Sequence, residues 1–393
     1  MSRYRYLLLS LGVVVASVFV AVFVTTAPAQ AATLTQIASF GSNPGNLAMY
    51  SYRPDGLASG RPLVVLLHGC TQDAATYFAN SGWRKYADLY GFQLVLPQTS
   101  TANNSLKCFT WFDTADINRD QGEALSIRTM VGYAVANLGA DPARVYVSGL
   151  SAGGAMSAVM LATYPDVFAA GSIAAGIPYK CATSSSGTSA CQYSGVDKTP
   201  QQWGDLVRAQ HGGPYPRVAI WQGQSDTTVV PKNGVELVDQ WTNLRGVSQT
   251  PTSTSGLTGG TTVKVYGDND VRLYEIANMA HGLPVDPGSA TDQCGTAASY
   301  FLDTICSAYH DSVFFGLASG TPPPSPSPSP SPSPTPSQTC VTASNYAHTQ
   351  AGRAHVSFGY TYANGSNQNM GLWNVAVITT LRQTGSNYWV IGC

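Results

Sequence analysis

The sequence predicts an α/β fold in which helices cover both faces of a mostly parallel sheet. Apolar strand patterns and helical patterns alternate between residues 47 and 315. One strand pattern, at 144–148, leads through a glycine-rich turn directly into a helical pattern. Ser172 is the one polar residue in the segment 168–175, a composition typical of a strand buried on both faces. Strands that alternate with helices form parallel sheets joined by crossover helices.

The individual elements follow from the spacing of apolar residues. Short apolar runs predict strands at 47–52, 62–67, 92–97, 144–148, 168–175, 218–222 and 271–276, the last of which is expected to be the final strand. Helical spacing predicts helices at 83–90, 123–138, 155–164 and 231–244, and a terminal helix around 299–315. Pro231 stands at the first turn of its helix, where the missing N–H group costs least.

The N-terminus has the pattern of an export signal. Arg3 and Arg5 precede an apolar run at 7–24, and Ala29-Gln30-Ala31 is a small-x-small cleavage site. We expect cleavage after Ala31 and a secreted, extracellular protein. The alternative is an uncleaved membrane anchor, because the apolar run approaches the length of a membrane span.

A proline-rich linker divides the remaining chain. Residues 321–339 hold nine prolines, mostly in Pro-Ser repeats that favour extended polyproline II. We therefore expect a signal peptide at 1–31, a large α/β domain at 32–320, the linker at 321–339 and a small module at 340–393.

The composition excludes several classes of function. Only 10% of the residues are charged and the formal net charge is −1, so no basic stripe is available for nucleic acid. Neither Cys-x-x-Cys nor His-Glu-x-x-His occurs, so we expect no metal and no cofactor. A monomer is expected.

The most informative motif is Gly149-Leu150-Ser151-Ala152-Gly153. It has the form Gly-x-Ser-x-Gly and lies between a predicted strand and a predicted helix. In that setting a sharp turn lifts the serine hydroxyl above the sheet, and the helix N-terminus favours an anion beside it. Ser151 is therefore the expected nucleophile.

A serine nucleophile needs a general base and an acid that orients the base, and in this architecture the chain order is Ser, acid, His. His281 lies in a loop after the predicted final strand, whereas the other five histidines lie too early, in the terminal helix or beyond the linker. Asp226 lies in the loop after the strand at 218–222. We expect Asp226 to be the acid, since the other candidates lie within a helix, in a hairpin turn or in an insertion.

An acyl-transfer site also needs donors for the developing oxyanion. The backbone N–H groups of Ala152 and Cys70 are expected to supply them, Cys70 from the loop after the strand at 62–67. The alternative for Cys70 is a free thiol nucleophile.

Eight cysteines are typical of an oxidised, exported protein. Although eight cysteines allow 105 connectivities, their positions favour four local pairs. The expected disulfides are Cys70–Cys108, Cys181–Cys191, Cys294–Cys306 and Cys340–Cys393.

These motifs together resemble a known family, the poly(3-hydroxybutyrate) depolymerase-type esterases, which are secreted α/β-hydrolases. The similarity covers nearly all of 35–318 and is carried by the segments 67–72, 108–112, 121–127, 149–156, 221–226 and 279–286. The resemblance implies the triad of Ser151, Asp226 and His281 and an insoluble polyester as the substrate. The same superfamily includes feruloyl and acetylxylan esterases, so an ester-bearing plant polysaccharide is the alternative substrate.

The small module at 340–393 carries only Arg353 and Arg382 as fixed charges and is rich in aromatic residues. Runs such as 373–380 predict short strands. The module resembles the substrate-binding module of extracellular polyhydroxyalkanoate depolymerases, which implies adhesion to a polymer; the alternative is that its aromatics only form a core. The candidate polymer-binding residues are Tyr346, Tyr362, Trp373 and Trp389. A third, non-enzymatic hypothesis is an adhesion protein with a vestigial hydrolase domain.

Overall fold

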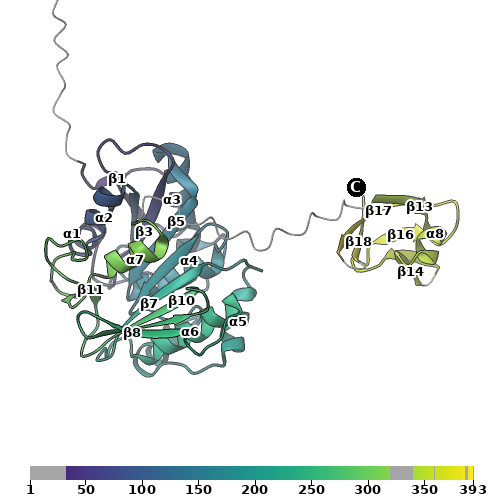
Figure 1. Ribbon diagram of the computed structural model, residues 1–393. Helices are drawn as coiled ribbons and strands as arrows, with labels where there is room; N and C mark the ends of the chain where they lie inside the picture. Colours follow the sequence, from purple (N-terminus) through teal and green to yellow (C-terminus); the bar gives the residue numbers. More distant parts are fainter. Residues whose placement is uncertain (1–31, 319–339, 358, 386–387, 393) are drawn as a thin grey trace, which may run out of the picture. The chain divides into compact units, whose positions relative to one another are not determined.

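The computed structural model describes residues 32–318, 340–357, 359–385 and 388–392. It divides the chain into two compact units, Met1–Thr321 and Pro322–Cys393, each of which is described by itself (Figure 1). The expected signal peptide, the linker and Cys393 lie outside the described residues. Within the described residues, no helix is long and apolar enough to cross a bilayer.

The larger unit is built on a ten-stranded sheet in the order β1-β2-β4-β3-β5-β6-β7-β10-β9-β8. The six strands from β4 to β10 run parallel, and antiparallel pairs extend the sheet at both edges. The predicted α/β fold is therefore confirmed. The strands are β1 Thr35–Ile37, β2 Ala48–Tyr52, β3 Arg61–Leu67, β4 Gln93–Gln98, β5 Ala140–Leu150, β6 Ala170–Ala174, β7 Arg217–Gly223, β8 Ser253–Leu257, β9 Thr261–Tyr266 and β10 Val271–Ile276.

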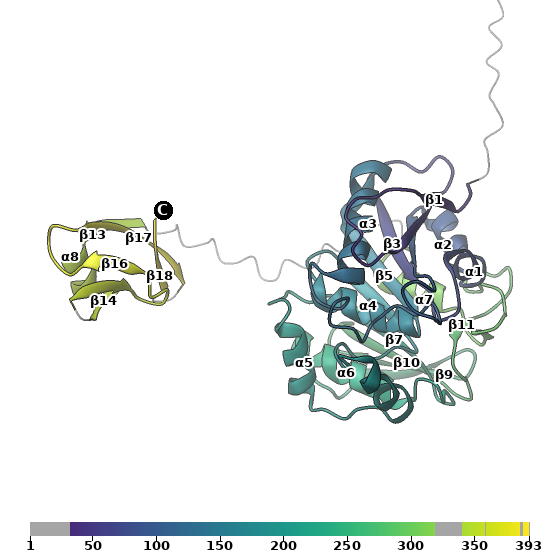
Figure 2. The same ribbon diagram turned by 180° about the vertical axis from the view of Figure 1, so that it is seen from behind.

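Helices cover both faces of this sheet, as the apolar strands require. In β3 the side chains of Leu63, Val65 and Leu67 pack on one face, and those of Val64 and Leu66 pack on the other. The first face carries α3, α4, α5 and α6, and the second carries α1, α2 and α7 (Figures 1 and 2). The helices are α1 Ala74–Asn80, α2 Trp83–Tyr90, α3 Gly122–Leu138, α4 Ala152–Thr163, α5 Pro200–Arg208, α6 Lys232–Arg245 and α7 Ser307–Phe315.

Two predictions near the end of this unit are wrong. The strand at 271–276 is not the last, because β11 (Leu283–Val285) and β12 (Phe301–Asp303) form a further parallel pair. The terminal helix does not start near residue 299, because β12 occupies that segment and α7 begins only after Cys306, which caps it.

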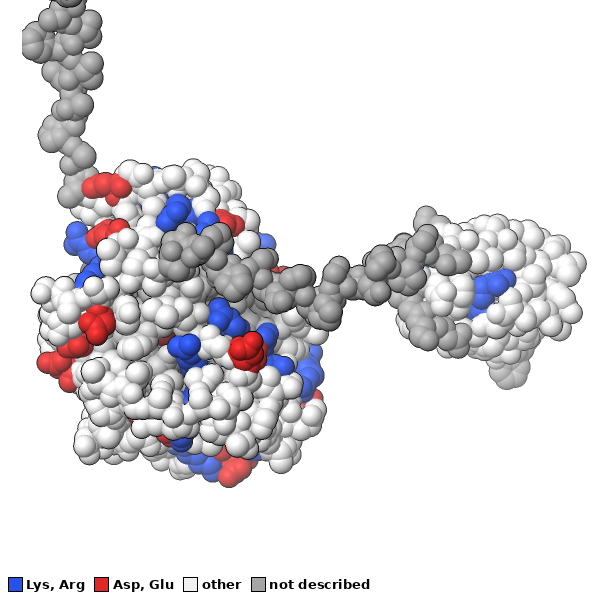
Figure 3. All heavy atoms as spheres, viewed as in Figure 1, with Lys and Arg blue, Asp and Glu red and all other residues white. Residues whose placement is uncertain are grey.

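Charged side chains are sparse on the face seen in Figure 3, where they stand in small groups between wide uncharged areas.

The smaller unit is rich in β-structure, as expected. Its two three-stranded antiparallel sheets enclose a small core of Ala354, Ala363, Met370, Leu381 and Trp389. The predicted strand at 373–380 is wrong in its first half, which forms a turn between two strands. The elements are β13 Cys340–Ser344, α8 Asn345–Gln350, β14 Ala354–Ser357, β15 Tyr360–Ala363, β16 Asn369–Leu372, β17 Ile378–Gly385 and β18 Tyr388–Ile391.

Candidate active site

Ser151 occupies the sharp turn between β5 and α4. Its backbone has φ 58° and ψ −119°, a conformation that non-glycine residues rarely adopt outside functional sites. The Ser151 N–H donates to the carbonyl of Ala174 (2.9 Å), which fixes the turn to the neighbouring strand. A Cβ atom on Gly153 would collide with the backbone carbonyls of Leu67 and His68, so glycine is required where α4 crosses β3.

Ser151, His281 and Asp226 lie in one hydrogen-bonded line. His281 Nε2 is 2.9 Å from Ser151 Oγ, and His281 Nδ1 is 2.7 Å from Asp226 Oδ2. The other carboxylate oxygen of Asp226 accepts hydrogen bonds from the N–H groups of Thr228 and Val229, both at 2.8 Å. The Asp226 carboxylate is fully buried and has both oxygens engaged, so it can hold the imidazole in a single orientation.

The sheet explains why these distant residues meet. Ser151 follows β5, Asp226 follows β7, and His281 lies beyond the end of β10. These three strands belong to the parallel run β5-β6-β7-β10, so their carboxyl ends share one edge of the sheet.

Hydrogen bonds made by the loop after β3 fix the orientation of the Cys70 N–H group, the first expected oxyanion donor. The Gly69 carbonyl accepts a hydrogen bond from His68 Nδ1 (2.8 Å), while His68 Nε2 accepts one from the Thr99 N–H (3.3 Å). Because C=O and N–H point in opposite directions across a trans peptide, fixing the Gly69 carbonyl also fixes the Cys70 N–H. Burial lowers the pKa of His68 to about 4, so the ring stays neutral and keeps both roles at neutral pH.

Further contacts hold the same loop. The Gly69 N–H donates to Gln72 Oε1 (2.8 Å), and the Thr71 N–H donates to the carbonyl of Leu106 (2.6 Å). Cys70 is bonded to Cys108, so the alternative of a free thiol nucleophile at Cys70 is wrong. Ala152, the second expected oxyanion donor, is the first residue of α4, where the N–H group has no partner within the helix.

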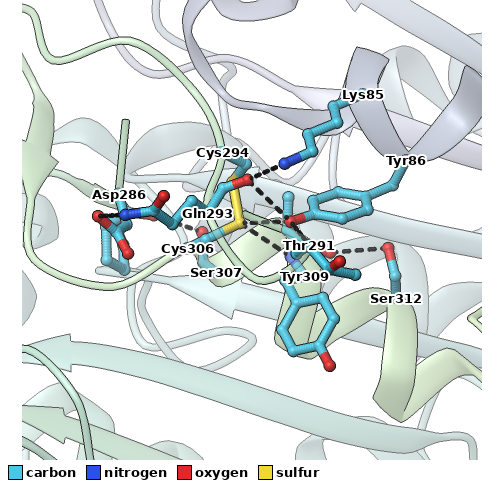
Figure 4. Close-up of a disulfide and its surroundings, with 12 residues drawn as sticks. Lys85, Tyr86, Asp286, Thr291, Gln293, Cys294, Cys306, Ser307, Tyr309 and Ser312 are labelled. Atoms are coloured by element: carbon cyan, nitrogen blue, oxygen red, sulfur yellow. Dashed lines mark hydrogen bonds between the residues drawn. A yellow bond between two sulfur atoms is a disulfide. The ribbon is translucent and has the colours of Figure 1, made fainter. Parts of the chain in front are cut away.

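Two further disulfides are present at expected positions, Cys181–Cys191 and Cys294–Cys306. The second closes a loop that α2 also anchors. Lys85 Nζ donates to the carbonyl of Gln293 (2.6 Å), and the Tyr86 hydroxyl donates to that of Thr291 (3.0 Å) (Figure 4). The pairing of Cys340 with Cys393 stays a prediction, since Cys393 lies outside the described residues.

A pocket of about 400 Å³ opens beside Ser151 and His281. None of its lining residues is Asp, Glu, Lys or Arg. The ring of Tyr300 stands edge-on to that of His281, with centroids 6.1 Å apart. Sequence reasoning missed Tyr300, Leu106 and Tyr193 as lining residues, because no motif marks them and the pattern around Tyr300 predicts a helix.

In the smaller unit, the four candidate polymer-binding aromatics differ in exposure. Tyr346 and Trp373 are both 42% exposed, and their ring centroids lie 5.6 Å apart. Tyr362 is half-buried beside His355. Trp389 is 8% exposed and packs in the small core, which corrects its expected role at the surface.

Comparison with known proteins identifies the family. A family model described as "Esterase PHB depolymerase" matches residues 47–264. Poly(3-hydroxyalkanoate) depolymerase C from Paucimonas lemoignei is 52% identical over 292 residues, which are 72% of this chain and 70% of the relative. The chain belongs to the PHB depolymerase esterase family. It is therefore a carboxylic ester hydrolase, and the serine hydrolase class fits its fold.

The chain is also similar to esterases with other names. An acetylxylan esterase from Coprinopsis cinerea is 39% identical over 264 residues, which are 65% of this chain and 70% of the relative. The structure of an acetyl xylan esterase from Aspergillus awamori superposes with a TM-score of 0.63 at 28% identity. The superposition covers 73% of this chain and 100% of the Aspergillus awamori chain.

Proposed function

We propose that this protein is a secreted serine esterase that hydrolyses short-chain polyhydroxyalkanoate through an acyl-enzyme on Ser151. The observation that carries the proposal is the hydrogen-bonded line from Asp226 through His281 to Ser151, which ends in a pocket without charged side chains. The 52% identity to a poly(3-hydroxyalkanoate) depolymerase supports the polyester as substrate.

In the proposed mechanism, Ser151 Oγ attacks the ester carbonyl carbon while His281 Nε2 takes the hydroxyl proton. The negative charge that develops on the carbonyl oxygen is stabilised by the N–H groups of Cys70 and Ala152. Asp226 keeps the His281 Nδ1 proton in place and stabilises the imidazolium. Collapse of the tetrahedral intermediate expels the alcohol, which takes the proton from His281. Water then attacks the acyl-enzyme with His281 again as base, and the acid and free Ser151 are released.

The alternative substrate is an acetyl or feruloyl ester on plant polysaccharide. The chemistry at Ser151 would be the same, and only the alcohol and acyl groups would differ. The identity and structural similarity to acetylxylan esterases support this alternative. A purely adhesive protein is disfavoured, because adhesion gives no reason for a fully buried Asp226 hydrogen-bonded to His281.

The proposal also covers the other parts of the chain. Residues 1–31 would direct export, and the three disulfides among the described residues support an oxidising destination. Residues 32–320 would form the catalytic unit and 340–393 a polymer-binding module, separated by the linker at 321–339. The exposed ring pair of Tyr346 and Trp373 supports adhesion by the module.

The test is Ser151→Ala assayed on p-nitrophenyl butyrate. We expect hydrolysis to fall by roughly 10⁶-fold, the loss seen when a serine hydrolase loses its nucleophile, while thermal unfolding stays close to that of the wild type. A fluorophosphonate probe should label the wild-type protein on the peptide that contains Ser151 and leave the variant unlabelled. Substantial turnover by the variant, or labelling elsewhere, would contradict the assignment.

A further inference from the structure

Exposed apolar side chains of the catalytic unit gather at the mouth of the pocket. Three large hydrophobic residues that line the pocket are also exposed to solvent: Leu106 (59%), Tyr193 (58%) and Tyr300 (46%). Exposed apolar groups that cluster beside a binding site are typical of a contact surface. We call these three residues the docking rim.

Each rim residue is fixed to a different loop of the catalytic site. The Leu106 carbonyl accepts a hydrogen bond from the Thr71 N–H (2.6 Å), in the loop at 68–72 that carries Cys70 (the oxyanion loop). The Tyr300 carbonyl accepts one from the Leu283 N–H, two residues after His281 (2.8 Å).

Tyr193 is held beside the loop of the catalytic acid. The carbonyl of its neighbour Gln192 accepts a hydrogen bond from the Val230 N–H (2.9 Å), and the adjacent Val229 donates to Asp226. Tyr193 also lies in a single π-helical turn, Ala190–Ser194, a geometry common at functional sites. Backbone hydrogen bonds therefore connect the segments of the three rim residues to the loops that carry Cys70, Asp226 and His281.

The disulfides reinforce this arrangement. Leu106 lies inside the loop closed by Cys70–Cys108 and Tyr300 inside the loop closed by Cys294–Cys306, while Tyr193 lies two residues beyond Cys191. A contact surface that is already rigid loses little conformational entropy when it binds a partner.

The backbone conformation of Tyr300 is a second indication of a functional role. Its φ angle is +64°, in the left-handed region that bulky side chains rarely adopt. The residue is 46% exposed, so packing in the protein core does not account for a tyrosine here. Such outliers persist at binding and catalytic sites, where strain is tolerated for function.

We propose that the docking rim of Leu106, Tyr193 and Tyr300 binds a neutral polyester chain at the pocket mouth, so that the catalytic unit itself recognises the polymer. This inference rests on the proposed polyester substrate. A charged polymer is disfavoured because the pocket lining contains no Asp, Glu, Lys or Arg. One leucine and two tyrosine rings match a chain of methyl and methylene groups that offers ester carbonyls but no hydrogen-bond donors along its length.

The test compares a rim variant with a matched control in the full-length protein. The rim variant is Leu106→Ser with Tyr193→Ser. The control is Leu89→Ser with Val235→Ser, two residues of similar exposure (55% and 50%) that do not line the pocket. Both are assayed for erosion of a poly(3-hydroxybutyrate) film, for hydrolysis of p-nitrophenyl butyrate and for release of acetate from acetylated xylan.

We expect the ratio of film erosion to soluble-ester hydrolysis to fall about tenfold or more in the rim variant, as when anchors are lost from a contact surface, and to stay unchanged in the control. Tyr300→Asn, whose residue type accepts positive φ, should also lower the ratio without lowering the thermal unfolding temperature. An unchanged ratio in the rim variant, or an equal fall in the control, would overturn the inference. If the rim variant released less acetate from xylan but eroded the film as the wild type does, the choice of polyester would be overturned. Failure of the wild type to erode the film would instead refute the proposed function, and this inference with it.

Discussion

Glu123, in the first turn of α3, allows a quantitative prediction about stability and pH. Its side chain is 1% exposed, and Oε2 accepts a hydrogen bond from the Thr110 N–H (2.8 Å). Oε1 has no hydrogen-bond partner among the described residues. Burial raises the pKa of Glu123 from 4.5 to about 8, and the nearby charge of Asp116 acts in the same direction. The folded protein therefore holds this proton at neutral pH, whereas the unfolded chain releases it.

The sign and size of the effect follow from proton linkage. Between pH 4.5 and about 8 the folded state binds one proton more than the unfolded state at this site. The contribution of Glu123 to the free energy of unfolding therefore falls by about 1.4 kcal/mol for each pH unit as the pH rises. It is fully present below pH 4.5, and from about pH 5.5 to 7.5 the loss is roughly 2.7 kcal/mol. Glu123→Gln removes this dependence, because glutamine does not titrate.

The assay is urea unfolding of wild type and Glu123→Gln at both pH values. Relative to the wild type, the variant should gain about 2.7 kcal/mol between the lower and the higher pH, whatever the constant cost of the substitution. Other titrating groups are common to both proteins and cancel in this difference. Glu275→Gln, which removes a carboxylate paired with Lys264 at 2.7 Å, controls for the general loss of negative charge. If the wild-type and Glu123→Gln free energies change in parallel with pH, the carboxyl group is not held protonated and the reasoning is refuted.

Three further predictions concern the catalytic parts. Asp226→Asn should lower kcat on p-nitrophenyl butyrate by roughly 10⁴-fold, because the amide no longer holds His281 in the required tautomer; a loss of less than tenfold would contradict its role. Replacing Cys70 and Cys108 together by serine should lower kcat more than it raises KM in steady-state kinetics, because the oxyanion loop loses its covalent anchor. An unchanged kcat with a lowered thermal unfolding temperature would mean that the disulfide is purely structural. Deleting 340–393 should leave soluble-ester turnover intact and slow the erosion of a polyester film, whereas equal losses on both substrates would mean that the module is structural.

Regular elements could be predicted from the sequence where the apolar pattern is strong. The helix α2 (Trp83–Tyr90) and the strand β10 (Val271–Ile276) have the predicted bounds, because tertiary packing agrees with their local periodicity. The helix α4 starts three residues earlier than predicted. Gly153 and Gly154 are weak helix formers, yet both lie in the helix, where the neighbouring backbone leaves no room for a Cβ atom.

The arrangement of Ser151, Asp226 and His281 could be predicted because parallel strands bring their following loops to one edge of the sheet. The rim residues could not be predicted, since Leu106, Tyr193 and Tyr300 lie in irregular segments whose paths depend on disulfides and long-range hydrogen bonds. In the smaller unit, composition alone could not separate the buried Trp389 from the exposed Trp373, because a small core and a binding face use the same residue types.

The most direct test of the central claim is the clearing of a poly(3-hydroxybutyrate) suspension by the full-length protein, with Ser151→Ala alongside. The turbidity should fall with the wild type and remain constant with the variant, while both proteins adsorb to the granules. A wild-type protein that hydrolyses p-nitrophenyl butyrate but leaves the suspension turbid would contradict the claim. The esters of plant polysaccharide would then be the substrate to test.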